Sequence, residues 1–196
     1  MIQKFAGSEI EKILKPLAEL RILIFKDFPY LYEGSFEYEK KYLSRYLKSE
    51  KSAVIAYFDQ DQIVGAATVL PLASEDSAIQ KPFIDHQVDL ENHYYFGESL
   101  LRKEYRGQGI GHLFFDEREK HALQDSKCQW TTFCAVDRPQ NHPLRPPQYQ
   151  PLDLFWQKRG YTKQHHLKTQ LSWQDLNEKI ETPKTLTFWT KPHGKN

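Results

Sequence analysis

Cysteine, net charge and long apolar segments are all scarce in this sequence. The two cysteines, Cys128 and Cys134, share one short apolar stretch and offer no disulfide framework, so we expect a reducing, cytoplasmic environment. No segment approaches the ~18 apolar residues of a membrane span, and Glu9 and Lys12 interrupt the N-terminal stretch where a secretory signal needs an apolar run. The formal net charge of +1, with both signs interspersed, predicts neither a nucleic-acid nor a membrane partner.

The remaining composition is typical of one globular domain. The 196 residues are enough to bury a sizeable core, and no internal repeat or boundary divides residues 1–196. Hydrophobic residues make up 39% and charged residues 27%, as in most soluble proteins. Aromatic residues reach 14%, which predicts an aromatic-lined pocket as well as an aromatic core.

Hydrophobic spacing predicts both helices and strands. A capping-box pattern at Ser8 and Glu11 predicts a helix through Leu17, kinked or delayed by Pro16, and a second helix begins after Ser35. Later helices are predicted within 75–90, from near Gly109 to near Gln124, and over 153–160. Predicted strands, of which the first two form a hairpin, cover 52–58, 62–72, 92–103, 129–136, 164–173 and 184–190.

The segment 137–151 reads DRPQNHPLRPPQYQP and holds five of the eleven prolines. Proline can neither pair within a central strand nor continue a helix, so this segment is predicted to lack both. Its polar and aromatic residues favour an ordered functional loop, and a rigid connector is the alternative.

Three glycines open the predicted helix after residue 109, in the stretch EYRGQGIGHL (104–113). The first turn of a helix leaves backbone N–H groups unpaired and carries partial positive charge, so such a turn is suited to bind a phosphate or pyrophosphate. The alternative is a tight turn in which Gly107, Gly109 and Gly111 only permit unusual backbone angles.

Two common phosphate-binding patterns do not fit this turn. The dinucleotide pattern G-x-G-x-x-G would need glycine at position 112, which is His112. The P-loop needs a Lys-Ser or Lys-Thr pair after its glycines, and none follows. The pattern that fits is R-x-x-G-x-G, from Arg106, Gly109 and Gly111.

With these motifs the sequence resembles the GNAT superfamily of acyl-coenzyme A-dependent N-acyltransferases. The stretch LLRKEYRGQGIG (100–111) is similar to the family's strand and pyrophosphate-binding turn, and LFWQKRGY (154–161) is similar to its later helix-then-strand segment. The resemblance implies an α/β (α+β) fold, a single domain with a mixed, mostly antiparallel central sheet flanked by helices. It also implies acetyl-CoA as co-substrate, with no metal.

The resemblance further implies which residues bind the coenzyme. Main-chain atoms on the strand before the turn would bind the pantetheine arm, and one N–H there would stabilise the oxyanion of the intermediate. The turn itself would bind the pyrophosphate. The residues implied are Leu100, Leu101, Arg102, Arg106, Gly107, Gln108, Gly109, Ile110, Gly111, His112 and Trp156.

The implied reaction is direct attack of a primary amine, on a small molecule or peptide, on the acyl thioester. Glu98, a carboxylate in an otherwise apolar, aromatic strand, is the predicted general base. Its alternative is a carboxylate at the rim that positions an amine or pairs with Arg102. Trp156 stands where the family commonly has a proton-donating Tyr, so Tyr149 is the predicted acid, with water or an unprotonated thiolate as alternatives. Cys134 is expected to pack in the core.

The acceptor pocket is predicted from two segments. By resemblance FPYLYEGS (28–35) contributes Tyr30, Tyr32 and Glu33, and the proline-rich loop contributes Asp137 and Arg138. A carboxylate with aromatic faces suits a cationic amine, whereas arginine suits an acceptor carboxylate, so polyamine-like and amino-acid-like acceptors both stay open. A homodimer, a lysine acetyltransferase acting on folded proteins and a non-catalytic acyl-CoA sensor also stay open.

Overall fold

The structure is a computed structural model that describes residues 1–194, and within them eight strands form one sheet. The strand order is β1-β2-β3-β4-β6-β8-β7, and β5 also pairs with β3. All pairs are antiparallel except β4 and β6, so the sheet is mixed and mostly antiparallel, as predicted. The strands are β1 Ile2–Ala6, β2 Ala53–Asp59, β3 Gln62–Pro71, β4 His93–Tyr95, β5 Ser99–Leu101, β6 Trp130–Val136, β7 Thr162–Trp173 and β8 Thr182–Pro192.

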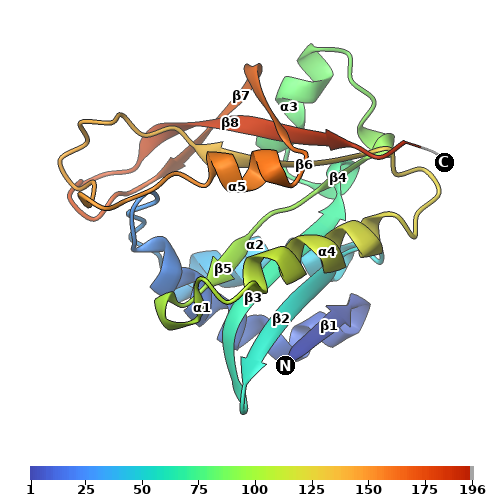
Figure 1. Ribbon diagram of the computed structural model, residues 1–196, viewed down its shortest axis with the longest axis horizontal. Coiled ribbons are helices and arrows are strands. Elements are labelled where there is room, and N and C mark those ends of the chain that lie inside the picture. The colour runs from blue at the N-terminus through green and yellow to red at the C-terminus, as the bar shows by residue number, and fades with distance from the viewer. Residues whose placement is uncertain (195–196) are drawn as a thin grey trace.

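Helices cover both faces of the sheet (Figure 1). On one face lie α1 Leu14–Phe25, α2 Phe36–Lys48 and α3 Ser77–Asp85, and on the other lie α4 Ile110–Ala122 and α5 Asp153–Lys158. Short 3-10 helices occur at Gly7–Ile13, Leu72–Ser74, Leu90–Asn92 and Lys103–Tyr105.

Each face has its own hydrophobic core, and the alternation of side chains along β2 supplies both. Val54 and Ala56 pack with residues of α1, α2 and α3, whereas Ala53 and Ile55 pack with residues of α4. Because successive strand residues point to opposite faces, a run of buried apolar residues fits a central strand covered on both sides. This explains why the segment 53–56 is apolar without interruption.

The N-terminus differs from the prediction. Residues 2–6 form the edge strand β1, which pairs with β2, and residues 7–13 are a 3-10 helix in which Ser8 makes no capping hydrogen bond. The α-helix begins only at Leu14, so Pro16 lies in its first turn, where a backbone N–H has no partner within the helix. Of the two effects predicted for Pro16, a kink or a delayed start, the structure shows the delayed start.

The strand predicted over 92–103 is interrupted. Its first part, β4, pairs with β6, and its second part, β5, pairs only with β3. Between them lies Gly97, where a Cβ atom would overlap the Tyr46 hydroxyl and approach Thr68 Oγ1 to 2.7 Å. Glycine is required here because the backbone passes so close to these side chains.

The other predicted elements are present. Ser35 caps α2 by accepting a hydrogen bond from the Tyr38 amide (3.3 Å), and β2 and β3 form the predicted hairpin. The segment from 137 to 152 contains neither helix nor strand. It is a succession of turns, in which the amides of His142 and Tyr149 donate to the carbonyls three residues earlier.

Candidate functional site

The site begins where two neighbouring strands separate. β4 and β6 run parallel up to the pair Tyr95 and Thr132, and the last hydrogen bond between them runs from the Phe96 amide to the Thr132 carbonyl (2.8 Å). Beyond that point the chain continues as β5, which pairs with β3 alone. One edge of β5 therefore has no strand partner, and Figure 1 shows β5 and β6 diverging behind α4 and α5. We call this the free edge of β5.

Hydrogen-bond direction identifies which residues present main-chain groups at the free edge. The Arg102 amide donates to the Val64 carbonyl (2.9 Å) and the Glu98 carbonyl accepts from the Thr68 amide (3.1 Å), so alternate residues from 98 to 102 are directed toward β3. The residues between them, Ser99 and Leu101, present their N–H and C=O groups at the free edge.

This alternation divides the three predicted pantetheine residues. Leu101 presents main-chain groups at the free edge, and its carbonyl accepts a hydrogen bond from Arg106 Nε (3.2 Å). Leu100 is fully buried in the core and Arg102 pairs with β3. Ser99 shares the orientation of Leu101, and the two-residue period of a strand was the signal that would have identified it.

The glycine turn follows at the end of β5. Gly107 and Gly109 have φ values of 77° and 81°, the left-handed region that favours glycine. Within the described part of the chain, the amides of residues 107–111 donate no hydrogen bond. We call these five amides the amide cradle. Gly107 and Gly109 thus permit unusual backbone angles, and the turn also leaves successive N–H groups without partners; the binding of a pyrophosphate there stays a prediction.

The remaining predicted residues of the turn surround the cradle. The Arg106 guanidinium is half-exposed, with Nη2 3.8 Å from Asp27 Oδ2. Gln108 donates to the Glu104 carbonyl (3.0 Å). The amide of His112 is already used within the helix, and its ring packs against Phe155 at 4.9 Å.

Helix α5 lies beside the amide cradle and contacts it through Phe155. The Phe155 ring lies 3.6 Å from the point where a Cβ of Gly111 would be. Trp156, at the position where a Tyr was expected, packs edge-on against Phe133 (5.0 Å) and Trp189 (5.1 Å). Trp156 therefore belongs to an aromatic cluster with Phe133 and Trp189, and its contact with the pantetheine stays a prediction.

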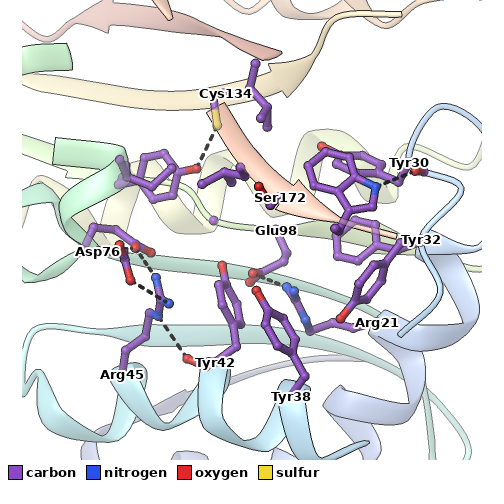
Figure 2. Close-up of a pocket in the computed structure, with 18 residues that line it drawn as sticks. Arg21, Tyr30, Tyr32, Tyr38, Tyr42, Arg45, Asp76, Glu98, Cys134 and Ser172 are labelled. Carbon is purple, nitrogen blue, oxygen red and sulfur yellow. Dashed lines mark hydrogen bonds and ion pairs between the residues drawn. The ribbon is translucent and has the colours of Figure 1, made fainter. Parts of the chain in front are cut away.

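A cavity of about 310 Å³ lies in front of the strand break (Figure 2). Elements α1 and α2, the segment after β3, and strands β4, β6, β7 and β8 contribute to it. We call it the aromatic cavity, because its lining includes Phe25, Tyr30, Tyr32, Tyr38, Tyr42, Tyr95 and Trp173. Its charged lining residues are Arg21, Arg45, Glu75, Asp76 and Glu98.

Glu98 connects the aromatic cavity with the free edge of β5. Its side chain lines the cavity, and its main chain leads directly into Ser99. The side chain is 1% exposed; Oε1 pairs with Arg21 Nη1, and Oε2 accepts from Thr68 Oγ1 and the Tyr46 hydroxyl. The partner of Glu98 is thus Arg21 and not Arg102. Both carboxylate oxygens are engaged, so a base role requires the acceptor amine to replace one of these partners or to act through water.

The pKa values of the phenols and the thiol in and beside the cavity limit the roles that these groups can have in a reaction. Burial raises the pKa values of Tyr42, Tyr46 and Tyr95 well above the usual range, so these phenols stay neutral and donate hydrogen bonds. Burial also raises the pKa of Cys134 to about 12, so its thiol stays protonated at neutral pH.

Four residues predicted for the acceptor pocket or the acid role lie outside the aromatic cavity: Glu33, Asp137, Tyr149 and Arg138. Glu33 is exposed, and its amide donates to the Gln174 carbonyl (2.9 Å). Asp137 accepts from Thr187 Oγ1 (2.7 Å) in a separate shallow depression. Tyr149 packs edge-on against Phe28 (4.7 Å), and burial raises its pKa, which makes it a weaker proton donor. Its role as the acid stays a prediction.

Arg138 connects three segments that lie far apart in the sequence. Its Nη1 and Nη2 atoms bind the Asp175 carboxylate at 2.7 and 2.9 Å, and its Nε and Nη2 donate to the carbonyls of Pro29 (2.7 Å) and Tyr30 (2.8 Å). Trp173 Nε1 also donates to the Tyr30 carbonyl (3.0 Å). The geometry therefore makes Arg138 a support for Tyr30 on the cavity wall.

Within residues 1–194, no group of three or more His, Cys, Asp or Glu side chains is placed to hold a metal ion. No helix in the same range is long and apolar enough to cross a membrane.

The model of the Acetyltransferase (GNAT) family matches residues 17–146. No curated protein matches the sequence significantly.

Solved structures of the same fold are numerous. A ribosomal-protein-alanine N-acetyltransferase from Brucella melitensis is 12% identical, with a TM-score of 0.63, over 98% of this chain and 99% of that one. NAA60 of Arabidopsis thaliana in complex with a bisubstrate analogue is 11% identical, with a TM-score of 0.60, over 99% and 100%. A chain of the NatC complex bound to Gag peptide and CoA is 13% identical, with a TM-score of 0.53, over 98% and 99%. At these identities the likeness shows the fold.

The Arg138→Ala substitution tests the supporting role of this residue. It leaves Asp175, which is 2% exposed, without its bidentate partner and the Pro29 carbonyl without its side-chain donor, so we expect a loss of about 3 kcal/mol in the free energy of unfolding. Urea unfolding measures it. Arg145→Ala is the control, because Arg145 makes a single 3.4 Å hydrogen bond to the Tyr149 carbonyl, and about 1 kcal/mol or less is expected there. Equal losses in the two variants would contradict the assignment.

Proposed function

Because the chain belongs to the acetyltransferase (GNAT) family, we propose that it transfers the acetyl group of acetyl-CoA to a primary amine by direct attack. One observation carries the proposal. Glu98 lies at the strand break, with its side chain in the aromatic cavity and its main chain at the start of the free edge. A coenzyme bound along that edge and an amine bound in the cavity would meet beside Glu98.

The coenzyme site is built from main-chain groups. The amide cradle and the half-exposed Arg106 would bind the pyrophosphate, since five free N–H groups at the start of a 13-residue helix favour an anion. The pantetheine amides would pair with Ser99 and Leu101 in the manner of an added strand. The NatC complex, which includes a chain of this fold, is bound to CoA in its crystal structure, and this supports the proposal.

The reaction forms a C–N bond, breaks the C–S bond and removes one proton from the amine nitrogen. The neutral amine nitrogen attacks the thioester carbon, the C–S bond breaks, and the sulfur leaves as thiolate. Glu98, directly or through water, takes the proton that the nitrogen loses. A main-chain N–H at the free edge of β5 stabilises the oxyanion. The protonated thiol of Cys134 favours this direct route over an acyl-cysteine intermediate.

Acetyl-CoA binding is the first experiment. At about one hundred times its dissociation constant, the coenzyme should add ~2.7 kcal/mol to stability, which thermal unfolding detects as a shift of a few degrees. NADH is the control ligand and should produce no shift. Release of free thiol with a panel of amines then separates turnover from binding. Binding without turnover would identify the non-catalytic sensor, and no binding at millimolar coenzyme would exclude both functions.

The Gly109→Val substitution tests the amide cradle. A valine is strained at a φ of 81° and places a branched side chain beside the amides, so acetyl-CoA binding should weaken at least tenfold by calorimetry. Gly7→Val is the matched control. Gly7 also has a positive φ and open space around it, but it lies in the 3-10 helix after β1 and not in the glycine turn. Undiminished affinity in Gly109→Val would remove the cradle from the coenzyme site.

The Glu98→Gln substitution tests the base. Coenzyme affinity should be retained while kcat falls ~100-fold or more, most severely at low pH, where more of the acceptor amine is protonated. The control is Glu39→Gln, since Glu39 pairs with the same Arg21 but does not line the cavity. If both variants lose the same activity, Glu98 acts by holding Arg21 in place and is not the proton acceptor.

A further inference from the structure

The aromatic cavity carries two charge clusters of the same composition. In the first, Arg21 binds the carboxylates of Glu39 and Glu98. In the second, Arg45 binds Glu75 and lies 3.7 Å from Asp76. Each cluster thus has two carboxylates for one guanidinium, and Figure 2 shows Arg45 and Asp76 on one side of the pocket and Arg21 on the other.

Among the residues that the structure describes, each cluster contains a buried carboxylate oxygen without a hydrogen-bond partner. Glu75 is 1% exposed in its side chain; its Oε2 binds Arg45 and the Asp76 amide, but its Oε1 accepts no hydrogen bond. Glu39 Oε1, in the first cluster, is also unpaired, but Glu39 does not line the cavity. A buried acceptor left unpaired is costly, so a donor that arrives with the ligand would stabilise the Glu75 carboxylate.

Arg45 compensates the buried Glu75 carboxylate only in part. Burial raises the pKa of Glu75 by more than the nearby Arg45 lowers it. A cation beside Glu75 would favour its ionised form, and Glu75 lines the cavity. A carboxylate on the ligand would instead face two carboxylates and one guanidinium at this end.

Tyr42 sets the spacing of the two clusters. The guanidinium carbons of Arg21 and Arg45 each lie 4.1 Å from the centroid of its ring, so they are at most twice that distance apart. The span suits a short aliphatic chain, and a volume of about 310 Å³ is that of a small-molecule site. The aromatic walls between the clusters suit methylene groups and ammonium groups alike.

We propose that the acceptor is a short aliphatic diamine, with one nitrogen at Glu98 and a second, cationic nitrogen held by Glu75 and Asp76. The proposal rests on the proposed function for the reacting nitrogen. The second subsite is formed by Glu75 and Asp76, from the segment between β3 and α3, and by Arg45, from α2.

Calorimetry of the whole protein with three ligands of equal chain length tests the diamine without any turnover. Cadaverine should bind at least tenfold more tightly than n-pentylamine, and δ-aminovalerate should bind more weakly than either. Equal affinity for cadaverine and n-pentylamine, or a preference for the amino acid, would overturn the proposal. Thiol release measured separately keeps the two ideas distinct. Acetylation of n-pentylamine as efficient as that of cadaverine would leave the acetyltransferase standing and the diamine subsite refuted.

Variants of the second cluster locate the subsite. Asp76→Asn keeps the cap of α3, since asparagine also accepts from the Ala78 amide, and should weaken cadaverine at least threefold while leaving n-pentylamine unchanged. Glu75→Gln should weaken cadaverine about tenfold. Asp85→Asn, at the other end of α3 and paired with Lys81 at the surface (2.8 Å), is the control and should bind as the unaltered protein does. If Asp76→Asn and Glu75→Gln bind both amines as the unaltered protein does, the subsite is elsewhere.

Discussion

The buried ion pair between Arg21 and Glu98 fixes the backbone between β4 and β5, where the chain stops pairing with β6. Both side chains are almost fully buried, and such a pair is costly to desolvate unless other hydrogen bonds complete it. Thr68 and Tyr46 complete it on the side chain, and Arg118 Nη1 donates to the Glu98 carbonyl (3.0 Å) from the opposite side of the sheet. Gly97 lets the backbone pass close enough to Tyr46 for these contacts to form.

Both the free edge of β5 and the aromatic cavity depend on the end of the pairing with β6. Because β5 does not pair with β6, Ser99 and Leu101 present main-chain groups that pair with no strand of residues 1–194, and the chain reaches the glycine turn on the face of α4. Because Glu98 turns toward α1 and α2, its carboxylate enters the aromatic cavity on the other face. The strand break therefore joins a site built from backbone amides to one built from side chains, and acyl transfer between two ligands needs such a junction.

Charge distribution gives the two sites different ligands. The amide cradle has N–H groups and the positive end of α4, which favour an anion. The aromatic cavity has more carboxylates than guanidinium groups and is walled by neutral phenols, which favours a cation. Under the proposed function, an anionic coenzyme and a cationic amine would be directed to opposite sides of Glu98, so neither would compete for the site of the other.

The sequence by itself determined the features that depend on neighbouring residues: the cap at Ser35, the hairpin of β2 and β3, and the turn with Gly107 and Gly109, because local geometry restricts which residues fit there. Its alternation and helical spacing also predicted most of the strands and helices, and the resemblance to the family implied that the strands form a mixed sheet. Tertiary structure alone decided that Arg21 pairs with Glu98, that Arg138 supports Tyr30, and that Glu75 lies in the cavity. These contacts join residues dozens of positions apart, and nothing in the local pattern of an Arg or Glu names its distant partner.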